Sequence, residues 1–244
     1  SLGLPAILKT RRFGYDGKGQ IVIREEDEVL AAWNELSGYP LILEGMVKFQ
    51  REVSLIVCRN RSGSVAFYPL VENHHRGGML RLSLAPAPGI TKAIQQAAES
   101  LGQRVVEELD YVGTLAIELF QMSTRRGESP RLLANEMAPR VHNSAHWTIE
   151  GSATSQFENH LRAILDWPLG STEMQGMIAM INLIGEMPNA PEILQIHDAH
   201  LHDYAKGQRE GRKLGHLTLR AKDEKSRDDV LARAQAILKI DSRE

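Results

Sequence analysis

The sequence predicts an α+β fold, and three observations support this prediction. Apolar runs of strand length recur along the chain, helical spacing is confined to a few separate segments, and the two kinds of element do not alternate strictly. Strict alternation would favour a doubly wound parallel sheet instead. With 244 residues, 42% of them hydrophobic, the chain has material for one large domain or two small ones with a substantial core.

The N-terminal part of the chain is predicted to form short strands around a glycine-rich loop. Residues 5–9 and 20–23 are short apolar runs on either side of this loop, and they predict two strands. Residues 25–36 have helical spacing, with acidic residues in the first turn, where the helix dipole favours them. Residues 40–45 form a further apolar run, which predicts a buried strand.

The rest of the chain predicts a strand-rich body with three helices. Strands are expected at residues 52–60, 64–71, 79–86, 113–122, 130–138, 177–185 and 214–221, where apolar runs end at turn residues. Helices are expected at residues 89–110, at 154–165 with Thr154 or Ser155 as the N-cap, and at 226–238. The segment STRRGES joins two of these strands as a hairpin.

Composition excludes several classes of protein. The formal net charge of −2 gives no overall attraction to nucleic acid or to an anionic membrane surface. The single cysteine, Cys58, cannot form an internal disulfide, which is typical of a reducing, cytoplasmic setting. No apolar run approaches the length of a membrane span, and the N-terminal residues lack a signal-peptide pattern. We therefore expect neither nucleic acid nor a membrane among the partners.

Two glutamates are predicted to face each other across the hairpin. If Glu118 and Glu136 are opposite in antiparallel strands, the turn centres on Gly127, in a segment suited to a turn. Their Cβ atoms would then lie within about 5 Å, a like-charged pair that needs a cation between its members. Carboxylate oxygens suit Mg²⁺, which usually keeps substrate phosphates as further ligands. The alternative is two unrelated strand-end acids, each solvated or paired with an arginine.

The residues after Glu136 favour a site. The stretch LLANEMAPRVHNSAH leaves a predicted strand and supplies Asn135, Arg140, His142, Asn143 and His146 in quick succession. A merely solvated loop would more often use Gly, Ser, Asp and Lys. An earlier segment, TRRFGYDGKGQ, lets backbone N–H groups approach phosphate oxygens and adds a lysine. That segment fits neither the Walker pattern nor the Rossmann fingerprint, and a glycine-rich hairpin with a lysine is, by itself, more often a plain turn.

Taken in order, several motifs resemble the ATP-grasp superfamily, and more narrowly its 5-(carboxyamino)imidazole ribonucleotide synthases. The motifs are PAILKTRRFGYDGKGQ, LILEGMVKFQREVSLIV, GTLAIELF, NEMAPRVHNSAHWTIE and LHDYAKGQREGRKLGHLTL. The resemblance implies a small glycine-loop lobe at residues 1–48, packed on a larger antiparallel-sheet lobe at 49–185. A C-terminal sheet and helix extension would follow at 186–244.

The resemblance also implies site residues. Those near ATP would be Lys9, Gly14, Tyr15, Asp16, Gly17, Lys18, Gly19 and Gln20 around the phosphates, Glu44, Gly45, Met46 and Val47 at the adenine, Glu52 at the ribose, and His75, Asn135 and Glu136. Glu118 and Glu136 would hold Mg²⁺, and Arg140, His142 and Asn143 would bind bicarbonate. Tyr15 and Asp16 would face the aminoimidazole substrate, with Asp16 orienting its amine. Lys206, Arg209, Arg212 and Lys213 would approach its phosphate, where arginine can bind two oxygens at once. The alternative for this basic cluster is a solvated turn.

The implied reaction is carboxylation of 5-aminoimidazole ribonucleotide with ATP and bicarbonate, through carboxyphosphate, in purine biosynthesis. Two alternatives remain at this point. One is another ATP-grasp ligase, such as a formate-dependent purine transformylase or a biotin carboxylase. The other is a nucleotide-binding fragment without turnover, because family members normally carry a further N-terminal domain before the LPAILK strand. A homodimer is expected for the full-length family.

Overall fold

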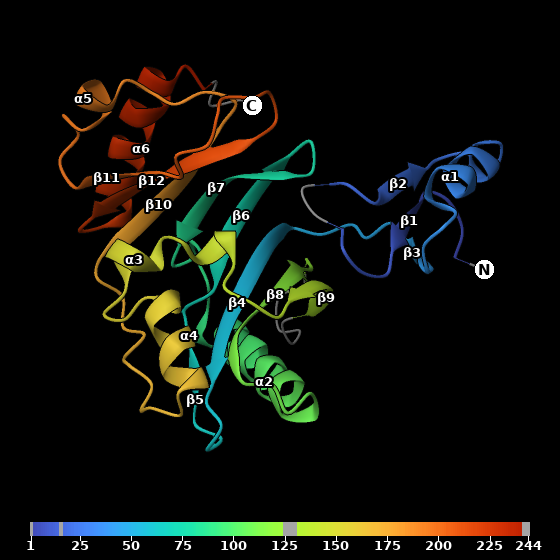
Figure 1. The fold of residues 1–244 in the computed structure, drawn as a ribbon, viewed down its shortest axis with the longest axis horizontal. Helices are drawn as coiled ribbons and strands as arrows, with labels where there is room; N and C mark the ends of the chain where they lie inside the picture. Colours follow the sequence, from blue (N-terminus) through green and yellow to red (C-terminus); the bar gives the residue numbers. More distant parts are fainter. Residues whose placement is uncertain (1, 15–16, 124–130, 241–244) are drawn as a thin grey trace. The chain divides into compact units, whose positions relative to one another are not determined.

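The computed structural model describes residues 2–14, 17–123 and 131–240. It divides into two compact units, Ser1–Phe49 with His75–Leu80, and Gln50–His74 with Arg81–Glu244. Figure 1 labels the elements of both units. None of the described helices is long and apolar enough to cross a membrane.

The first unit is a small antiparallel sheet with one helix packed on it. Its elements are β1 (Ala6–Thr10), β2 (Gln20–Ile23), α1 (Glu28–Leu36) and β3 (Leu41–Gly45), and the strand order is β2-β1-β3. Leu8 and Ile23 pack against Ala32 and Leu36 of the helix, which forms the core of this unit. The backbone N–H of Thr10 donates to the carbonyl of Gly19 and so closes the glycine-rich hairpin.

The second unit is built on one 9-stranded sheet, with the order β11-β12-β10-β7-β6-β4-β8-β9 and β5 paired with β4. The strands are β4 (Arg51–Arg59), β5 (Val65–Phe67), β6 (Val71–Arg76), β7 (Met79–Ala85), β8 (Gly113–Gln121), β9 (Leu132–Ala138), β10 (Met177–Ile184), β11 (Ala199–Asp203) and β12 (Lys213–Ala221). The helices are α2 (Lys92–Glu108), η1 (Asn143–Ala145), α3 (Thr148–Gly151), α4 (Gln156–Ile164), α5 (Ala190–Ile193) and α6 (Glu224–Leu238).

One face of this sheet is apolar and is covered by helices. Side chains at every second position of β4 and β8, such as Leu55 and Ile117, pack with Ala98 and Val106 of α2. On β10 and β12 the corresponding positions pack against α6 and the segment around Ile193. Alternation of side chains along a strand leaves the intervening residues on the opposite face.

That opposite face carries a row of polar side chains. Directly opposed residues of neighbouring strands share a face, and the opposed pairs here are Glu136 with Glu118, Glu118 with Ser54, Asn182 with His216, and His216 with His202. Asn73 on β6 connects the two halves of the row, because its Nδ2 donates to Ser54 and its Oδ1 accepts from Ser83. We call this the polar face. Helices α3 and α4 lie in front of the sheet in Figure 1.

The α+β expectation is confirmed, with local differences. The strand expected at 64–71 is divided into β5 and β6 because the buried Tyr68 donates from its hydroxyl to the carbonyl of Thr154. The side-chain oxygen of Gln95 accepts from the backbone N–H of Leu70. At this position a side chain therefore takes the place of the strand partner in the backbone hydrogen bonding. Strand β11 was not expected, since its sequence AHLHD is too polar to read as a buried strand. Ser155, one of the two expected N-caps, accepts from the N–H of Glu158.

Candidate functional site

The two glutamates of the hairpin lie opposite each other, as predicted from the sequence. Glu118 of β8 pairs with Glu136 of β9, and Ile117 pairs with Met137 in the same register. Toward the turn the register shifts, so that Leu119 pairs with Ala134. Asn135 is therefore the extra residue of a β-bulge beside the carboxylate pair. The predicted turn residue, Gly127, lies outside the described residues.

A third carboxylate lies beside this pair on the polar face. Glu52 of β4 is two residues from Ser54, which is opposite Glu118, and carboxylate oxygens of Glu52 and Glu118 lie within 4.8 Å of each other. His75 is on the outgoing end of β6 and is grouped with the first unit. The ribose role expected for Glu52 and the nucleotide role expected for His75 remain predictions.

His142 connects the loop after β9 to the carboxylates. Its Nε2 lies 3.6 Å from Oε1 of Glu118, and its Nδ1 lies 2.8 Å from Oγ of Ser144. The backbone N–H of Ser144 also points at Nδ1, at 3.4 Å, which makes Nδ1 an acceptor and leaves the proton on Nε2. Arg140 is exposed, and its Nη1 donates to the carbonyl of Val141. Of the predicted bicarbonate residues, His142 thus lies beside Glu118.

Two buried amides that sequence reasoning missed hold this loop on the polar face. Asn143 and Asn182 exchange a pair of side-chain hydrogen bonds of 2.8 and 2.7 Å. Gln156 is fully buried; its Oε1 accepts from the backbone N–H of His142 and its Nε2 donates to the His142 carbonyl. The only feature of the sequence that could have indicated Asn182 and Gln156 is that each is a polar residue at an inward-facing position of a predicted strand or helix.

Three imidazoles and a phenol form a cluster next to the loop, in which His216 is buried and the other three side chains are half-buried. His216 and His202 are stacked, with ring centroids 4.2 Å apart, and His146 lies 5.2 Å from His216. The hydroxyl of Tyr204 is 2.8 Å from Nδ1 of His216, and Nε2 of His202 is 2.6 Å from a carboxylate oxygen of Glu150. Burial raises the pKa of Tyr204 to about 12, so its hydroxyl keeps its proton at neutral pH.

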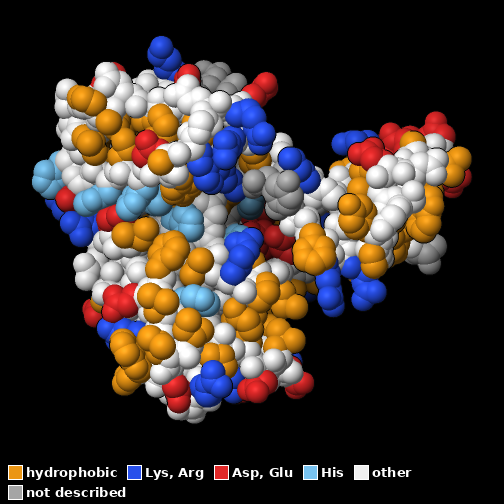
Figure 2. Space-filling model, in the orientation of Figure 1, with side chains coloured by type: hydrophobic (Ala, Val, Ile, Leu, Met, Phe, Trp, Pro, Cys, Tyr) orange, Lys and Arg blue, Asp and Glu red, His pale blue; other side chains and the backbone are white. Residues whose placement is uncertain are grey.

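The predicted basic residues all lie between two members of this cluster in the chain, and one of them contacts it. Lys206, Arg209, Arg212 and Lys213 come from the loop between β11 and β12 and the start of β12. The Nζ of Lys206 is 5.0 Å from the ring centre of Tyr204, and the N–H of Arg212 donates to the carbonyl of Arg209 in a tight turn. Figure 2 shows Lys and Arg side chains gathered on the larger unit, near a band of histidines.

The first unit contains most of the predicted nucleotide residues, whereas Glu52, Asn135 and Glu136 belong to the second. Lys9 and Glu44 form an ion pair of 2.7 Å across β1 and β3. Gly17 has a φ of +75°, and a Cβ there would meet the Cα of Gly78 at 2.9 Å, so this hairpin requires glycine. The remaining loop residues, Gly14, Lys18, Gly19 and Gln20, and the linker Gly45, Met46 and Val47 are described, whereas Tyr15 and Asp16 lie outside the described residues.

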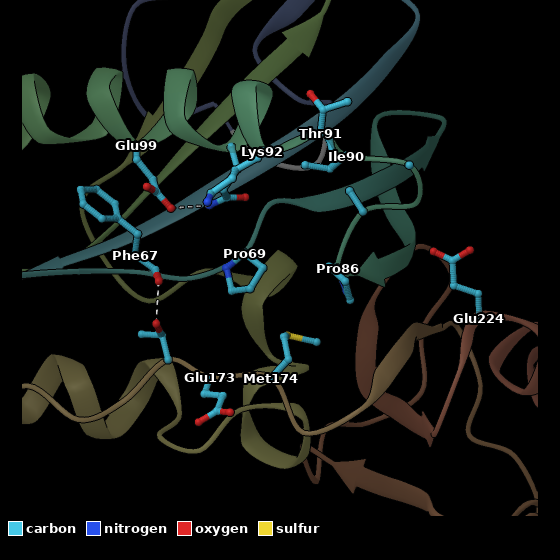
Figure 3. Close-up of a pocket in the computed structure, with 14 residues that line it drawn as sticks. Phe67, Pro69, Pro86, Ile90, Thr91, Lys92, Glu99, Glu173, Met174 and Glu224 are labelled. Atoms are coloured by element: carbon cyan, nitrogen blue, oxygen red, sulfur yellow. Dashed lines mark hydrogen bonds between the residues drawn. The ribbon is translucent and has the colours of Figure 1, made fainter.

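A separate pocket of about 510 Å³ opens at the start of α2. Figure 3 shows its lining, with Lys92 and Glu99 on the helix and Glu173 and Met174 on the facing segment. Thr172 closes one side by donating to the carbonyl of Phe67. None of the predicted site residues lines this pocket. It therefore does not change the placement of the candidate site.

Comparison with known protein families identifies the family to which this chain belongs. The model of the ATP-grasp domain matches residues 1–157. The chain belongs to the ATP-grasp family. A second model, the phosphoribosylaminoimidazole carboxylase C-terminal domain, matches residues 178–229, which contain β10, β11, β12 and the basic loop of this ATP-grasp chain.

Individual relatives are named for one activity. A curated N5-carboxyaminoimidazole ribonucleotide synthase from Pseudomonas aeruginosa is 49% identical over 98% of this chain and 64% of the relative. The crystal structure of N5-carboxyaminoimidazole ribonucleotide synthetase from Thermus thermophilus matches with a TM-score of 0.88 and 58% identity, over 96% of this chain and 62% of that one. A synthase from Aspergillus clavatus, in complex with ADP and 5-aminoimidazole ribonucleotide, matches with a TM-score of 0.85 and 33% identity, over 98% and 63%. This ATP-grasp chain thus spans less than two thirds of these relatives.

The buried imidazoles predict acid sensitivity. Burial is the main reason why the pKa of His146 falls to about 4 and that of His216 to about 3, and neighbouring His and basic groups add to it. The unfolded chain, with histidine pKa values of about 6.5, binds more protons, so stability is present above about pH 6.5 and is lost as the pH falls toward the folded values. Each histidine contributes a slope approaching about 1.4 kcal/mol per pH unit.

Urea unfolding measured at about pH 7 and about pH 5.5 checks this prediction. We expect a clear loss of unfolding free energy at the lower pH, and a smaller loss in His216→Gln. His197→Gln is the matched control, because the side chain of His197 is 94% exposed. The same pH-dependent loss in His216→Gln and in the unmodified chain would contradict the assignment.

Proposed function

We propose that this chain carries the ATP-grasp and C-terminal parts of a ligase that carboxylates 5-aminoimidazole ribonucleotide. The reaction uses ATP and bicarbonate and gives N5-carboxyaminoimidazole ribonucleotide, ADP and phosphate. The observation that carries the proposal is the opposed pair Glu118 and Glu136 with His142 beside it. The names of the relatives, and the ligands named for the Aspergillus clavatus structure, support the choice of substrates.

The carboxylates fit a divalent cation. Oxygens of Glu52 and Glu118 lie within 4.8 Å of each other, and Glu136 is the cross-strand neighbour of Glu118. Hard oxygen donors of this kind suit Mg²⁺. We therefore propose that Glu118 and Glu136 hold Mg²⁺, with Asn135 beside the nucleotide. When bound, the ion would supply positive charge next to the phosphate oxygens.

The nucleotide is proposed to contact the lysines and glycines at residues 9–20 and several residues further along the chain. Lys9 and Lys18 would offset the charge that develops on the transferring phosphoryl group. Glycine at positions 17 and 19 lets backbone N–H groups approach the phosphates. The segment Glu44, Gly45, Met46 and Val47 would read the adenine edge, Glu52 would bind the ribose hydroxyls, and His75 would contact the nucleotide.

Bicarbonate is a poor electrophile, and ATP overcomes this by converting it to carboxyphosphate. Arg140 would fix bicarbonate in line with the γ-phosphate, which is a positioning role. His142 and Asn143 would complete its contacts, and both are held in place by the buried amides of Gln156 and Asn182. Carboxyphosphate then transfers its carboxyl group, or the CO₂ it releases, to the substrate amine, which Asp16 and Tyr15 are proposed to orient.

The basic loop predicts selectivity for a phosphorylated substrate. Replacing both Arg209 and Lys213 with Ala is expected to weaken binding of 5-aminoimidazole ribonucleotide by about 100-fold, because two charge-assisted contacts to phosphate are lost. Binding of the dephosphorylated nucleoside should not change. Isothermal titration calorimetry with both ligands measures the difference. Equal weakening of the two would show that these side chains do not contact the phosphate.

ADP release tests the proposed function directly. We expect release that requires Mg²⁺ and increases when bicarbonate and 5-aminoimidazole ribonucleotide are both present. A formate requirement in place of bicarbonate would instead indicate the second candidate, a formate-dependent ATP-grasp ligase. Mg·ATP binding without any turnover would identify a nucleotide-binding fragment. A cytoplasmic homodimer is part of the same proposal, and light scattering on the purified chain tests the dimer.

A further inference from the structure

His146, which the proposed function leaves without a role, is held in one tautomer by Gln156. The backbone N–H and carbonyl of His142 fix the orientation of the Gln156 amide, since the N–H can only donate and the carbonyl can only accept. Nε2 of Gln156 therefore has a second hydrogen to offer, and it lies 3.0 Å from Nδ1 of His146. Nδ1 of His146 must accept, so the ring proton is on Nε2.

The Nε2–H of His146 is a donor for which the described residues offer no acceptor. The ring is enclosed by Phe157 at 5.3 Å, His216 at 5.2 Å and Tyr204 at 6.4 Å between ring centroids. These contacts are ring packing, and the one hydrogen bond to this imidazole is the bond from Gln156. Burial favours the neutral ring. The His146 side chain is half-buried, and its Nε2 is not one of the buried nitrogens that lack a partner, so a water or a ligand oxygen can reach this N–H.

The charges around His146 indicate what that molecule is. Lys213, from the proposed phosphate loop, and Arg140, from the proposed bicarbonate loop, both lie close enough to act on the imidazole electrostatically. His146 is thus influenced by one member of each of the two groups of cations that the proposed function assigns to anionic ligands. Donation of a hydrogen bond from a neutral ring adds a contact to an oxyanion without adding a third positive charge.

We infer that His146 is a further substrate-binding residue, whose Nε2–H donates to an anionic oxygen of a substrate. The acceptor is either a carboxyl oxygen of bicarbonate or a phosphate oxygen of the ribonucleotide. Gln156 is then a positioning residue, since it sets the tautomer through Nδ1 and holds the backbone of His142 with the same amide. This inference rests on the proposed function.

Two substitutions at position 146 separate binding from structure. His146→Asn keeps an acceptor that Gln156 can reach but has no distal donor, whereas His146→Gln restores an N–H near the place of Nε2. We expect His146→Asn to raise KM for one of the two anionic substrates by about 10- to 100-fold, with ATP affinity unchanged. His146→Gln should recover most of that loss.

The matched control is His160→Asn. Nδ1 of His160 also accepts a single N–H, from the backbone of Thr114, but this ring is on α4 and outside the proposed site. We expect its kinetics to equal those of the unmodified chain. A higher KM for bicarbonate alone in His146→Asn assigns the carboxyl oxygen. A higher KM for the ribonucleotide, but not for its nucleoside, assigns the phosphate. Equal impairment of His146→Asn and His146→Gln, or normal KM values in both, would overturn the inference.

Nitrogen-detected NMR of the full chain provides a readout besides activity. With ¹⁵N-labelled histidine, His146 should show the Nε2–H tautomer, and its Nε2 resonance should shift when bicarbonate or 5-aminoimidazole ribonucleotide is added. If neither ligand binds and neither stimulates ADP release, the proposed function fails. If a ligand binds and the Nε2 resonance of His146 stays in place, only the present inference fails.

Discussion

Glu136→Gln is expected to lower ATP turnover by at least about 1,000-fold, the scale of losing a charge that organises phosphoryl transfer. The glutamine amide has nearly the same shape as the carboxylate but is neutral. The pair of residues 118 and 136 therefore keeps only one of the two negative charges that would attract a cation. The pairing of β8 with β9 should be retained, because the Glu136 side chain is exposed and the pairing is formed by backbone hydrogen bonds. ADP release and calorimetric Mg·ATP binding across a magnesium titration measure the effect.

Glu158→Gln serves as the control for this substitution. Glu158 forms an exposed ion pair with Arg162 on α4, of a kind worth little. We expect its turnover and magnesium dependence to match those of the unmodified chain. If Glu136→Gln were fully active at limiting Mg²⁺, Glu136 would not be a metal ligand, and the register of the hairpin would be a structural feature only.

Arg140→Lys is expected to raise the bicarbonate requirement by about 100-fold while ATP affinity changes little. Lysine keeps the positive charge but lacks the planar fork that binds two oxygens at once. In the structure the guanidinium of Arg140 is exposed and donates to the carbonyl of the next residue in its own loop, so the substitution removes little folding energy. Initial rates against bicarbonate, with calorimetry for Mg·ATP, separate the two affinities.

The exposed Arg104 on α2 provides the comparison, and Arg104→Lys should leave both affinities unchanged. Equal losses for bicarbonate and ATP in Arg140→Lys would indicate that the loop after β9 has rearranged. In that case the bicarbonate assignment of Arg140 would have to be abandoned.

The sequence predicted the parts of the fold that depend on local periodicity. The opposed pair Glu118 and Glu136 followed from strand alternation and a glycine-containing turn, and the structure confirms it. The N-cap at Ser155 followed from side-chain chemistry in the same way. Both are short-range features, in which the residues that decide the geometry are close in sequence.

What the sequence did not predict depends on contacts between distant residues. Asn182 is fixed opposite His216 by the pairing of β10 with β12, and it meets Asn143 from a loop 39 residues earlier in the chain. From the sequence, Gln156 is simply the first residue of a predicted helix. Only the fold shows that its side-chain amide forms a hydrogen bond with the backbone of His142. Periodicity gives no information about such pairings. The roles of the site residues themselves remain predictions.

The bulge at Asn135 has a consequence for how this hairpin tolerates insertions and deletions. In a regular strand, removing one residue moves every later side chain to the other face of the sheet. Here the register of the ladder steps over Asn135, so a chain without this residue would still pair Leu119 with Ala134 and Glu118 with Glu136. Asn135 is thus an addition to an otherwise continuous ladder. The codon for Asn135 can therefore be lost while the two carboxylates keep their alignment.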